Sequence, residues 1–149
     1  MTASAIADGQ TVLLDTRVLI HFLEGHERFG PVAEDILRRI ERGEIKGVIS
    51  NLVFAELLVP LYREGEAKAA AGLVSRLSSF SNLSVHGLDV ETAAMAARLC
   101  AEHGLRTPDA LHAATAIMAG ADGILTNDRQ LRRLEGEDLK IWLFDDLSH

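Results

Sequence analysis

The fold of this chain is decided by the stretch Val12-Leu13-Leu14-Asp15-Thr16-Arg17. Its three apolar residues follow one another without a polar residue between them, which is typical of a short strand buried on both faces of a sheet. Asp15 comes directly after this strand, and a stretch of helical period begins at Arg17. A buried strand that leads into a helix is the start of a crossover unit, and such units build parallel sheets.

The same alternation of short apolar runs and longer helical stretches continues along the chain. The predicted strands cover 12–14, 47–49, 83–85, 123–125 and 141–144. The predicted helices cover 17–23, 32–42, 51–62, 67–80, 90–103 and 108–118, with a short one over 128–134. Because right-handed crossovers place helices on both faces, we expect a central, mostly parallel five-stranded sheet in an α/β fold. The sequence predicts one domain over 11–147, preceded by a flexible tail over 1–10.

The composition fits one soluble domain. Of the 149 residues, 48% are apolar and 25% charged, as in globular proteins. The formal charge of −7 argues against sequence-blind adhesion to nucleic acid or an anionic membrane, although a local basic groove stays open. The single cysteine, Cys100, excludes an internal disulfide and a cysteine-built zinc site. Charged residues interrupt every apolar run, and no signal peptide is recognisable, so we expect a cytoplasmic protein without a membrane partner.

Three aspartates lie where helices begin. Asp15 and Asp128 each follow a buried strand at the point where the chain turns into the next helix, and Asp109 lies in the first turn of the helix over 108–118. Each has an ordinary explanation when taken alone, because Asp is a common N-cap and the helix dipole favours an acid in the first turn.

Glu56 is the only charged residue of the run 52–62. Leu52, Ala55 and Val59 share its side of the predicted helix, so we expect that side to be a buried apolar face. A carboxylate buried there would be protonated or would need a positive group beside it. The alternative is a surface glutamate at the edge of the apolar stripe.

Together the four acids predict a metal site. The carboxyl ends of neighbouring parallel strands meet at one edge of a sheet, which is where open α/β sheets bind ligands. Converging carboxylates repel one another unless a cation lies among them, and oxygen ligands suit Mg²⁺ or Mn²⁺. The histidines show no metal-ligand spacing, and only His112, one turn after Asp109, lies near the predicted site. Since carboxylate-bound metal ions activate water for phosphodiester displacement, the spacing predicts a metal-dependent phosphoryl hydrolase.

Four motifs also resemble those of a known family. They are Leu14-Asp15-Thr16-Arg17-Val18-Leu19-Ile20, Ser50-Asn51-Leu52-Val53-Phe54-Ala55-Glu56-Leu57, Thr107-Pro108-Asp109-Ala110-Leu111-His112-Ala113-Ala114-Thr115-Ala116 and Leu125-Thr126-Asn127-Asp128. In this order and spacing, over residues 12–147, the chain resembles the PIN-domain ribonucleases, and among them the toxins of VapBC-type toxin–antitoxin pairs. Any one motif alone would be a weak signal.

The resemblance implies a PIN-like fold with an acidic Mg²⁺ or Mn²⁺ pocket. It also implies endonucleolytic cleavage of single-stranded or looped RNA, leaving a 3′-hydroxyl and a 5′-phosphate. As partners it implies a second copy of the chain in a homodimer, and a small antitoxin that inserts a helix, often with a basic side chain, into the pocket.

By position, the four acids would take the family's acidic places. Asp15 and Asp109 would be the principal metal ligands, Glu56 would act through the metal or water, and Asp128 would hold a second metal ion. Smaller polar residues would orient carboxylates and water; these are Thr16, Thr126 and Asn127.

Arg17 departs from the family's pattern, which generally has Ser or Asn at this place. Its guanidinium either binds RNA phosphate, pairs with an acid and displaces a metal ion, or points to solvent. Arg106 and Arg129 flank the acidic motifs and are further candidates for phosphate contacts, with a plain surface position as the alternative.

Three functional hypotheses follow. The first is a metal-dependent endoribonuclease, and the second, motivated by Arg17, is an RNA- or protein-binding module with little catalysis. The third is a phospho-receiver or a dehalogenase-type phosphatase. The phosphatase requires a second Asp where Arg17 stands, and the receiver requires an acid pair before the first strand, which this chain lacks.

Overall fold

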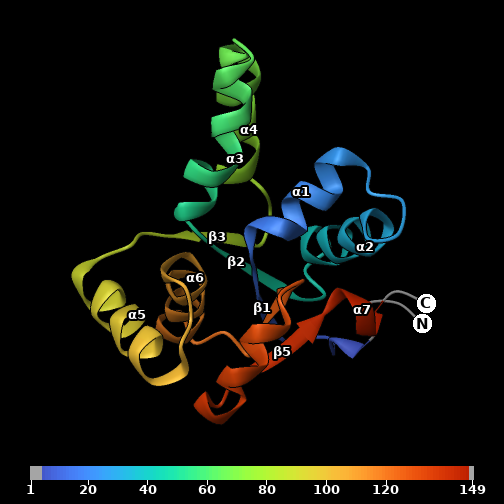
Figure 1. The fold of residues 1–149 in the computed structure, drawn as a ribbon. Helices are drawn as coiled ribbons and strands as arrows, with labels where there is room; N and C mark the ends of the chain where they lie inside the picture. Colours follow the sequence, from blue (N-terminus) through green and yellow to red (C-terminus); the bar gives the residue numbers. More distant parts are fainter. Residues whose placement is uncertain (1–4, 148–149) are drawn as a thin grey trace.

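Five parallel strands form the centre of the computed structural model, which describes residues 5–147 (Figure 1). They are β1 (Thr11–Leu14), β2 (Lys46–Ser50), β3 (Leu83–His86), β4 (Gly123–Thr126) and β5 (Lys140–Leu143). Their order in the sheet is β3-β2-β1-β4-β5, and every neighbouring pair is parallel. The predicted five-stranded α/β sheet is confirmed, and β1 is its central strand.

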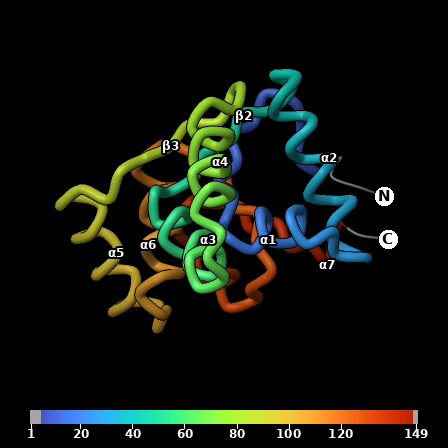
Figure 2. Tube along the Cα trace, turned by 90° about the horizontal axis from the view of Figure 1, so that it is seen from above, coloured from blue at the N-terminus to red at the C-terminus, as the bar shows by residue number. Residues whose placement is uncertain are grey.

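Helices cover both faces of the sheet, as predicted. Those on one face are α1 (Thr16–Glu24), α2 (Gly30–Glu41), α3 (Leu52–Arg63) and α4 (Ala67–Ser78), and those on the other are α5 (Val90–His103) and α6 (Thr107–Met118). Figure 2 shows α5 and α6 on one side of the molecule and α1 and α2 on the other. The chain closes with α7 (Phe144–Leu147). Within residues 5–147, no helix combines the length and apolar character that crossing a lipid bilayer requires.

The pleat of β1 divides the core into two apolar layers. Val12 and Leu14 join the cluster formed with α1 to α4, whereas Leu13 joins the cluster formed with α5 and α6, and all three are fully buried. Alternate residues of a strand point to opposite faces, so a strand covered on both sides must be apolar at every position. The unbroken apolar run in the sequence therefore has its physical cause in this double burial.

The segment predicted as a short last helix is a 3-10 helix, η2 (Arg129–Glu137). Its buried residues are Leu131 and Leu134, three positions apart. A 3-10 helix has three residues per turn, so this spacing places both leucines on one line facing the core. A segment that buries only these two side chains gains nothing from the wider face of an α-helix.

The hairpin of α3 and α4 projects from the body of the molecule (Figure 1). The buried residues of α3 are Val53 and Leu57, whereas Ala55, Glu56 and Val59 are exposed. The prediction that Glu56 lies on a buried apolar face is wrong. Because only one side of the projecting helix packs against the body, the stripe through Val53 and Leu57 is buried and the neighbouring one is left open.

Part of the expected N-terminal tail packs against the domain. Ile6 is fully buried in the core, and the backbone N–H of Gly9 donates to the carbonyl of Glu44 at 2.8 Å. Residues 1–4 of that tail lie outside the described part of the chain. The buried side chain of Ile6 therefore anchors residues 5–10 to the domain.

A network of charged groups joins the end of α5 to η2. The guanidinium of Arg98 donates to both carboxylate oxygens of Glu137 at 2.9 and 3.0 Å, and Nε2 of His103 lies 2.8 Å from the same carboxylate. The hydrogen bonds from Arg98 and then His103 lower the pKa of Glu137 to about 2. The charged form of Glu137 is therefore favoured in the folded state.

Gly123 is a packing constraint that substitution can test. A Cβ at this position would clash with the carbonyl oxygen of Lys140 and lie 2.6 Å from the ring of Trp142, whereas a Cβ at Gly72, inside α4, would meet nothing within 4 Å. We expect Gly123→Ala to lower the free energy of unfolding by about 1–3 kcal/mol, or to prevent folding. Gly72→Ala should instead raise it by about 0.5–1 kcal/mol. Urea unfolding of both variants tests this, and equal effects would contradict the packing of β4 on β5.

The lowered pKa of Glu137 predicts a pH dependence of stability. A carboxyl whose pKa is depressed in the folded state stabilises the protein above its unfolded pKa, and that contribution is lost as the pH falls toward about 2. Glu137→Gln should therefore be less stable than wild type at neutral pH, and the difference should shrink as the pH falls below about 4.5. Glu135→Gln, at an exposed position of η2, is the control. A difference that stays constant from pH 7 to pH 2.5 in urea unfolding would refute the role of the charge.

Candidate functional site

Asp15 lies at the carboxyl end of the central strand and caps α1. Its Oδ1 accepts a hydrogen bond from the N–H of Arg17 at 2.9 Å, and its Oδ2 accepts one from the hydroxyl of Thr126 at 2.5 Å. The residue is only 8% exposed. Burial raises the pKa of Asp15, and the hydrogen bond from Thr126 opposes that effect. The carboxylate of Asp15 therefore both caps α1 and belongs to the candidate site.

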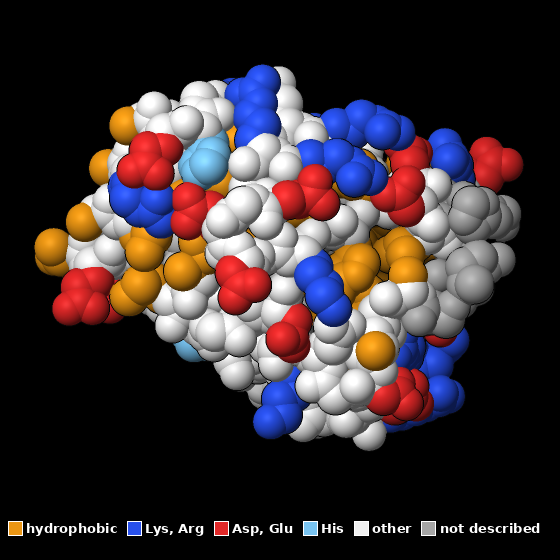
Figure 3. Space-filling view, turned by 90° about the horizontal axis from the view of Figure 1, so that it is seen from below, with side chains coloured by type: hydrophobic (Ala, Val, Ile, Leu, Met, Phe, Trp, Pro, Cys, Tyr) orange, Lys and Arg blue, Asp and Glu red, His pale blue; other side chains and the backbone are white. Residues whose placement is uncertain are grey.

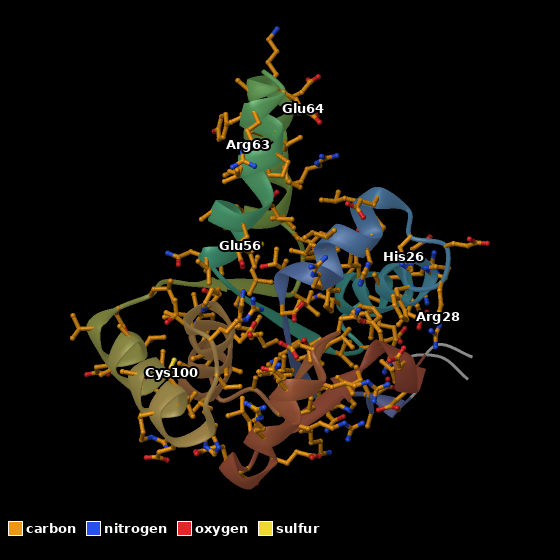
Figure 4. The ribbon with its side chains drawn as sticks, viewed as in Figure 1. His26, Arg28, Glu56, Arg63, Glu64 and Cys100 are labelled. Carbon is orange, nitrogen blue, oxygen red and sulfur yellow. The ribbon has the colours of Figure 1, made fainter. Side chains whose placement is uncertain are left out.

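Glu56 reaches the same region from the first turns of α3, where Figure 4 labels it at the base of the hairpin. Its Oε1 accepts a hydrogen bond from the hydroxyl of Thr16 at 2.5 Å and lies 2.9 Å from Nε2 of His112. These hydrogen bonds, with that of His112 the largest cause, lower the pKa of Glu56. Glu56 is therefore held as a carboxylate at the edge of the site.

His112 is a buried residue of α6, with 4% of its surface exposed. Its Nδ1 is buried and has no hydrogen-bond partner within the described part of the chain. A buried N–H without an acceptor is costly, so the ring is best accommodated with its proton on Nε2, donating to Glu56. The sequence singled out His112 only by its place one turn after Asp109, and gave no signal for this contact.

Asp109 and Asp128 complete the group of acids. Asp109 lies in the first turn of α6, and its Oδ2 accepts a hydrogen bond from Nε of Arg106 at 3.2 Å. Asp128 caps η2 through the N–H of Gln130, at 2.9 Å. Burial raises the pKa of Asp109, and the neighbouring carboxylate of Asp128 adds to this. The two negative groups lie close enough to destabilise each other.

The segments that follow β1 and β4 and the first turns of α3 and α6 line a hollow of about 770 Å³. Its lining includes eight of the ten predicted site residues: Asp15, Thr16, Arg17, Glu56, Arg106, Asp109, Asn127 and Asp128. Thr126 lies behind the lining and acts through Asp15. Arg129 is absent from the lining, and its guanidinium pairs with the carboxylate of Asp145 at 2.7 Å.

The donor set of the hollow suits a hard divalent cation. Its charged oxygens come from four carboxylates, and burial raises the pKa of two of them, Asp15 and Asp109. A bound cation would remove the cost of keeping these groups ionised together. In residues 5–147, the only three His, Asp or Glu ligand atoms within 4.8 Å of one another belong instead to Glu102, His103 and Glu137. Arg98 already pairs with both glutamates of that trio, which makes it a structural network.

Comparison with known proteins identifies the family. The PIN domain model matches residues 12–137, which is most of the chain. The chain belongs to the PIN-domain family. No curated protein sequence matches it.

Several solved structures share this PIN fold. VapBC2 from Rickettsia felis, bound to a DNA fragment from its promoter, is 19% identical over 89% of this chain and 98% of that chain, with a TM-score of 0.68. A toxin–antitoxin complex from Klebsiella pneumoniae is 20% identical over 84% and 91%, with a TM-score of 0.60. VapC20 from Mycobacterium tuberculosis, described as a sarcin–ricin loop cleaving toxin, is 20% identical over 76% and 86%, with a TM-score of 0.58.

The contact between His112 and Glu56 gives a test of this PIN-domain site. In His112→Leu, Glu56 loses its main donor, so its pKa should rise toward or above the ordinary 4.5. In His112→Gln, the amide N–H₂ stands near the place of Nε2 and should keep the pKa of Glu56 low. Carboxyl NMR titration of Glu56 measures both. An unchanged pKa in His112→Leu would contradict the assigned contact.

Proposed function

We propose that this PIN-domain protein is a Mg²⁺- or Mn²⁺-dependent endoribonuclease and the toxin of a toxin–antitoxin pair. The observation that carries the proposal is the convergence of Asp15, Glu56, Asp109 and Asp128 on one hollow at the carboxyl edge of the sheet. Family membership and the fold shared with toxin–antitoxin proteins support it. The substrate we propose is single-stranded or looped RNA.

In this proposal the carboxylates divide the work. Asp15 and Asp109 would hold the principal ion and Asp128 a second one, and such ions supply Lewis-acid stabilisation of the phosphate and lower the pKa of bound water. Thr126 and the N–H of Arg17 fix both oxygens of Asp15, so its position is set before a ligand binds. Asn127, on the wall of the hollow, would orient water.

Glu56 is the candidate proton acceptor. Thr16 and His112 hold its Oε1, which leaves Oε2 to take a proton from the attacking water. The water oxygen would bond to phosphorus in line with the P–O3′ bond, which breaks; the leaving 3′-oxygen would take a proton from solvent water, so that the products are a 3′-hydroxyl and a 5′-phosphate. Because the pKa of Glu56 is lowered, the group is ionised at neutral pH.

Arg17 and Arg106 are the proposed phosphate contacts, since both line the hollow. Within residues 5–147, Arg17 forms no ion pair with any of the four acids, so the geometry gives no support to a guanidinium that displaces a metal ion. Arg129 is a weaker candidate because of its pairing with Asp145. The binding-module alternative, which Arg17 motivated, is thus left with the place of Arg17 on the wall of the hollow and without an ion pair to an acid among the described residues.

As partners we propose a small antitoxin and a second copy of the chain in a homodimer, acting in the cytoplasm. Solved structures of toxin–antitoxin systems with this fold support the antitoxin. Exposed apolar side chains on α1 and α3 would suit a protein partner; they are Phe22, Leu23, Val59 and Tyr62.

The proposal predicts metal-dependent RNA cleavage that the acids control. Chelator-stripped protein should bind Mn²⁺ in isothermal titration and cleave RNA only when Mg²⁺ or Mn²⁺ is restored. Asp15→Asn and Asp109→Asn should each lower the cleavage rate at least about 100-fold and weaken Mn²⁺ binding. Asp35→Asn, outside the hollow, is the matched control and should behave as wild type.

Two results would count against this function. Full cleavage by both variants, or cleavage that survives excess chelator, would show that the acids hold no catalytic ion. Tight RNA binding with no cleavage at millimolar Mn²⁺ would favour the binding module instead.

A further inference from the structure

A second hollow, of about 520 Å³, opens beside the carboxyl ends of β2 and β3. Asn51 follows β2, and His86 ends β3; Asp89, Thr115 and Met118 provide further parts of the wall. None of these residues belongs to the acidic hollow. The volume is within the usual range of small-molecule binding pockets.

Helix α6 connects the two hollows. Asp109 and His112 line the acidic hollow, whereas Thr115 and Met118 line the second one. Each step of three residues turns the side chain by about 60° around the axis, so His112 and Thr115 are neighbours, whereas Asp109 and Met118 lie on opposite sides of α6 and about 14 Å apart along its axis. The two hollows therefore adjoin at His112 and Thr115, and a few nucleotides of an extended strand would span the distance between them.

Helix α3 gives the same connection on the other side. Asn51 borders the second hollow at the start of α3, and Glu56 borders the acidic one. Between them lies the exposed Ala55. The sequence predicted this stripe of α3 to be buried, but Ala55 is exposed and its side chain is a single methyl group.

The chemistry of the second hollow suits a base better than a phosphate. No Lys or Arg lines it, and the carboxylate of Asp89 would repel an anion. Asp89 uses its Oδ1 to accept from the N–H and the hydroxyl of Thr92 at 2.8 and 2.7 Å, which leaves Oδ2 for another donor. His86 offers a ring for stacking, and Met118 an apolar wall that is 44% exposed.

We propose that this hollow is a subsite for one base of the RNA strand, a few nucleotides from the cleaved bond. Single-stranded RNA is recognised by stacking of its bases and by hydrogen bonds to their edges, which matches this set of side chains. Asp89 accepts a hydrogen bond from an amino group of the base, and Asn51 hydrogen-bonds its edge. The inference rests on the proposed function and adds to it a determinant of sequence preference.

Asp89→Asn is the deciding variant. Asn caps a helix as well as Asp does, so Oδ1 can keep accepting from Thr92 while an amide N–H₂ replaces the free oxygen. The probes are 12-nucleotide RNAs in which each position in turn carries A, C, G, U or an abasic site. Binding is measured by fluorescence anisotropy with Mn²⁺ in the Glu56→Gln background, which removes the proposed proton acceptor and keeps the proposed metal ligands, so that base preference is read without cleavage.

With Asp89 intact, one position should bind an amino-bearing base about 10-fold more tightly than an abasic site. Asp89→Asn should abolish or invert that preference, and leave binding of the abasic RNA unchanged. Glu91→Gln, which removes a charge outside the hollow in the same turn of α5, is the matched control and should keep the preference. His86→Ala should reduce the advantage of every base over the abasic site.

Other outcomes would overturn the subsite. One such outcome is that no position discriminates a base from an abasic site. Another is that Asp89→Asn and Glu91→Gln change binding equally, which would indicate an effect of net charge alone. If Met118→Ala changes the oligomeric state of the protein in solution and leaves the base preference unchanged, the hollow is an interface between copies of the chain. Failure of the proposed nuclease is a separate result, since it appears as absent cleavage by the wild type with Mn²⁺, whereas the subsite is read from binding.

Discussion

The burial of β1 on both faces is the constraint on which the rest of this PIN domain depends. Val12, Leu13 and Leu14 have no exposed surface, so the chain can become polar only where the strand leaves the sheet. That place lies between β2 and β4, and the N–H of Asp15 still bonds to the carbonyl of Leu125 there, at 3.3 Å. The first carboxylate is thus held by sheet hydrogen bonding as well as by its cap. The other site residues are arranged around the Asp15 carboxylate, which these hydrogen bonds hold in one position.

That rigidity has an electrostatic consequence. The buried carboxylate of Asp15 cannot turn toward water when other acids approach, whereas Asp109 and Asp128 are half-buried, Asp128 being held by its cap of η2. The structure compensates only part of this charge, through Thr126 for Asp15 and Arg106 for Asp109. The remaining repulsion is an energy that a divalent cation would recover on binding, because the ligands are already in place. Glu56 differs, since Thr16 and His112 stabilise it without any ion.

The fold could be predicted from the sequence because its signals are local. An apolar run such as Val12 to Leu14 needs only its own residues to indicate a doubly buried strand, and the acids that follow strands go to the correct edge once the sheet is parallel. The side of α3 that is buried could not be predicted, because Leu52, Ala55 and Val59 are as apolar as the true buried stripe. The contact of His112 with Glu56 was also beyond prediction, since it joins residues 56 positions apart in two helices. The apolar pattern indicates which residues tend to be buried, but it does not indicate which helices extend away from the body of the domain.

The negative charge of the acidic hollow opposes the binding of RNA phosphate unless metal ions are bound there. The chain carries −7 overall, and Figure 3 shows acidic and basic side chains interspersed on one face instead of a continuous basic surface. Arg17 and Arg106 are the cations on the rim of the hollow, against four carboxylates inside it. With the hollow free of metal, a phosphate there meets a net negative field, and two bound divalent ions would cancel the four formal charges. In the proposed function, RNA affinity at this edge would then be coupled to metal binding.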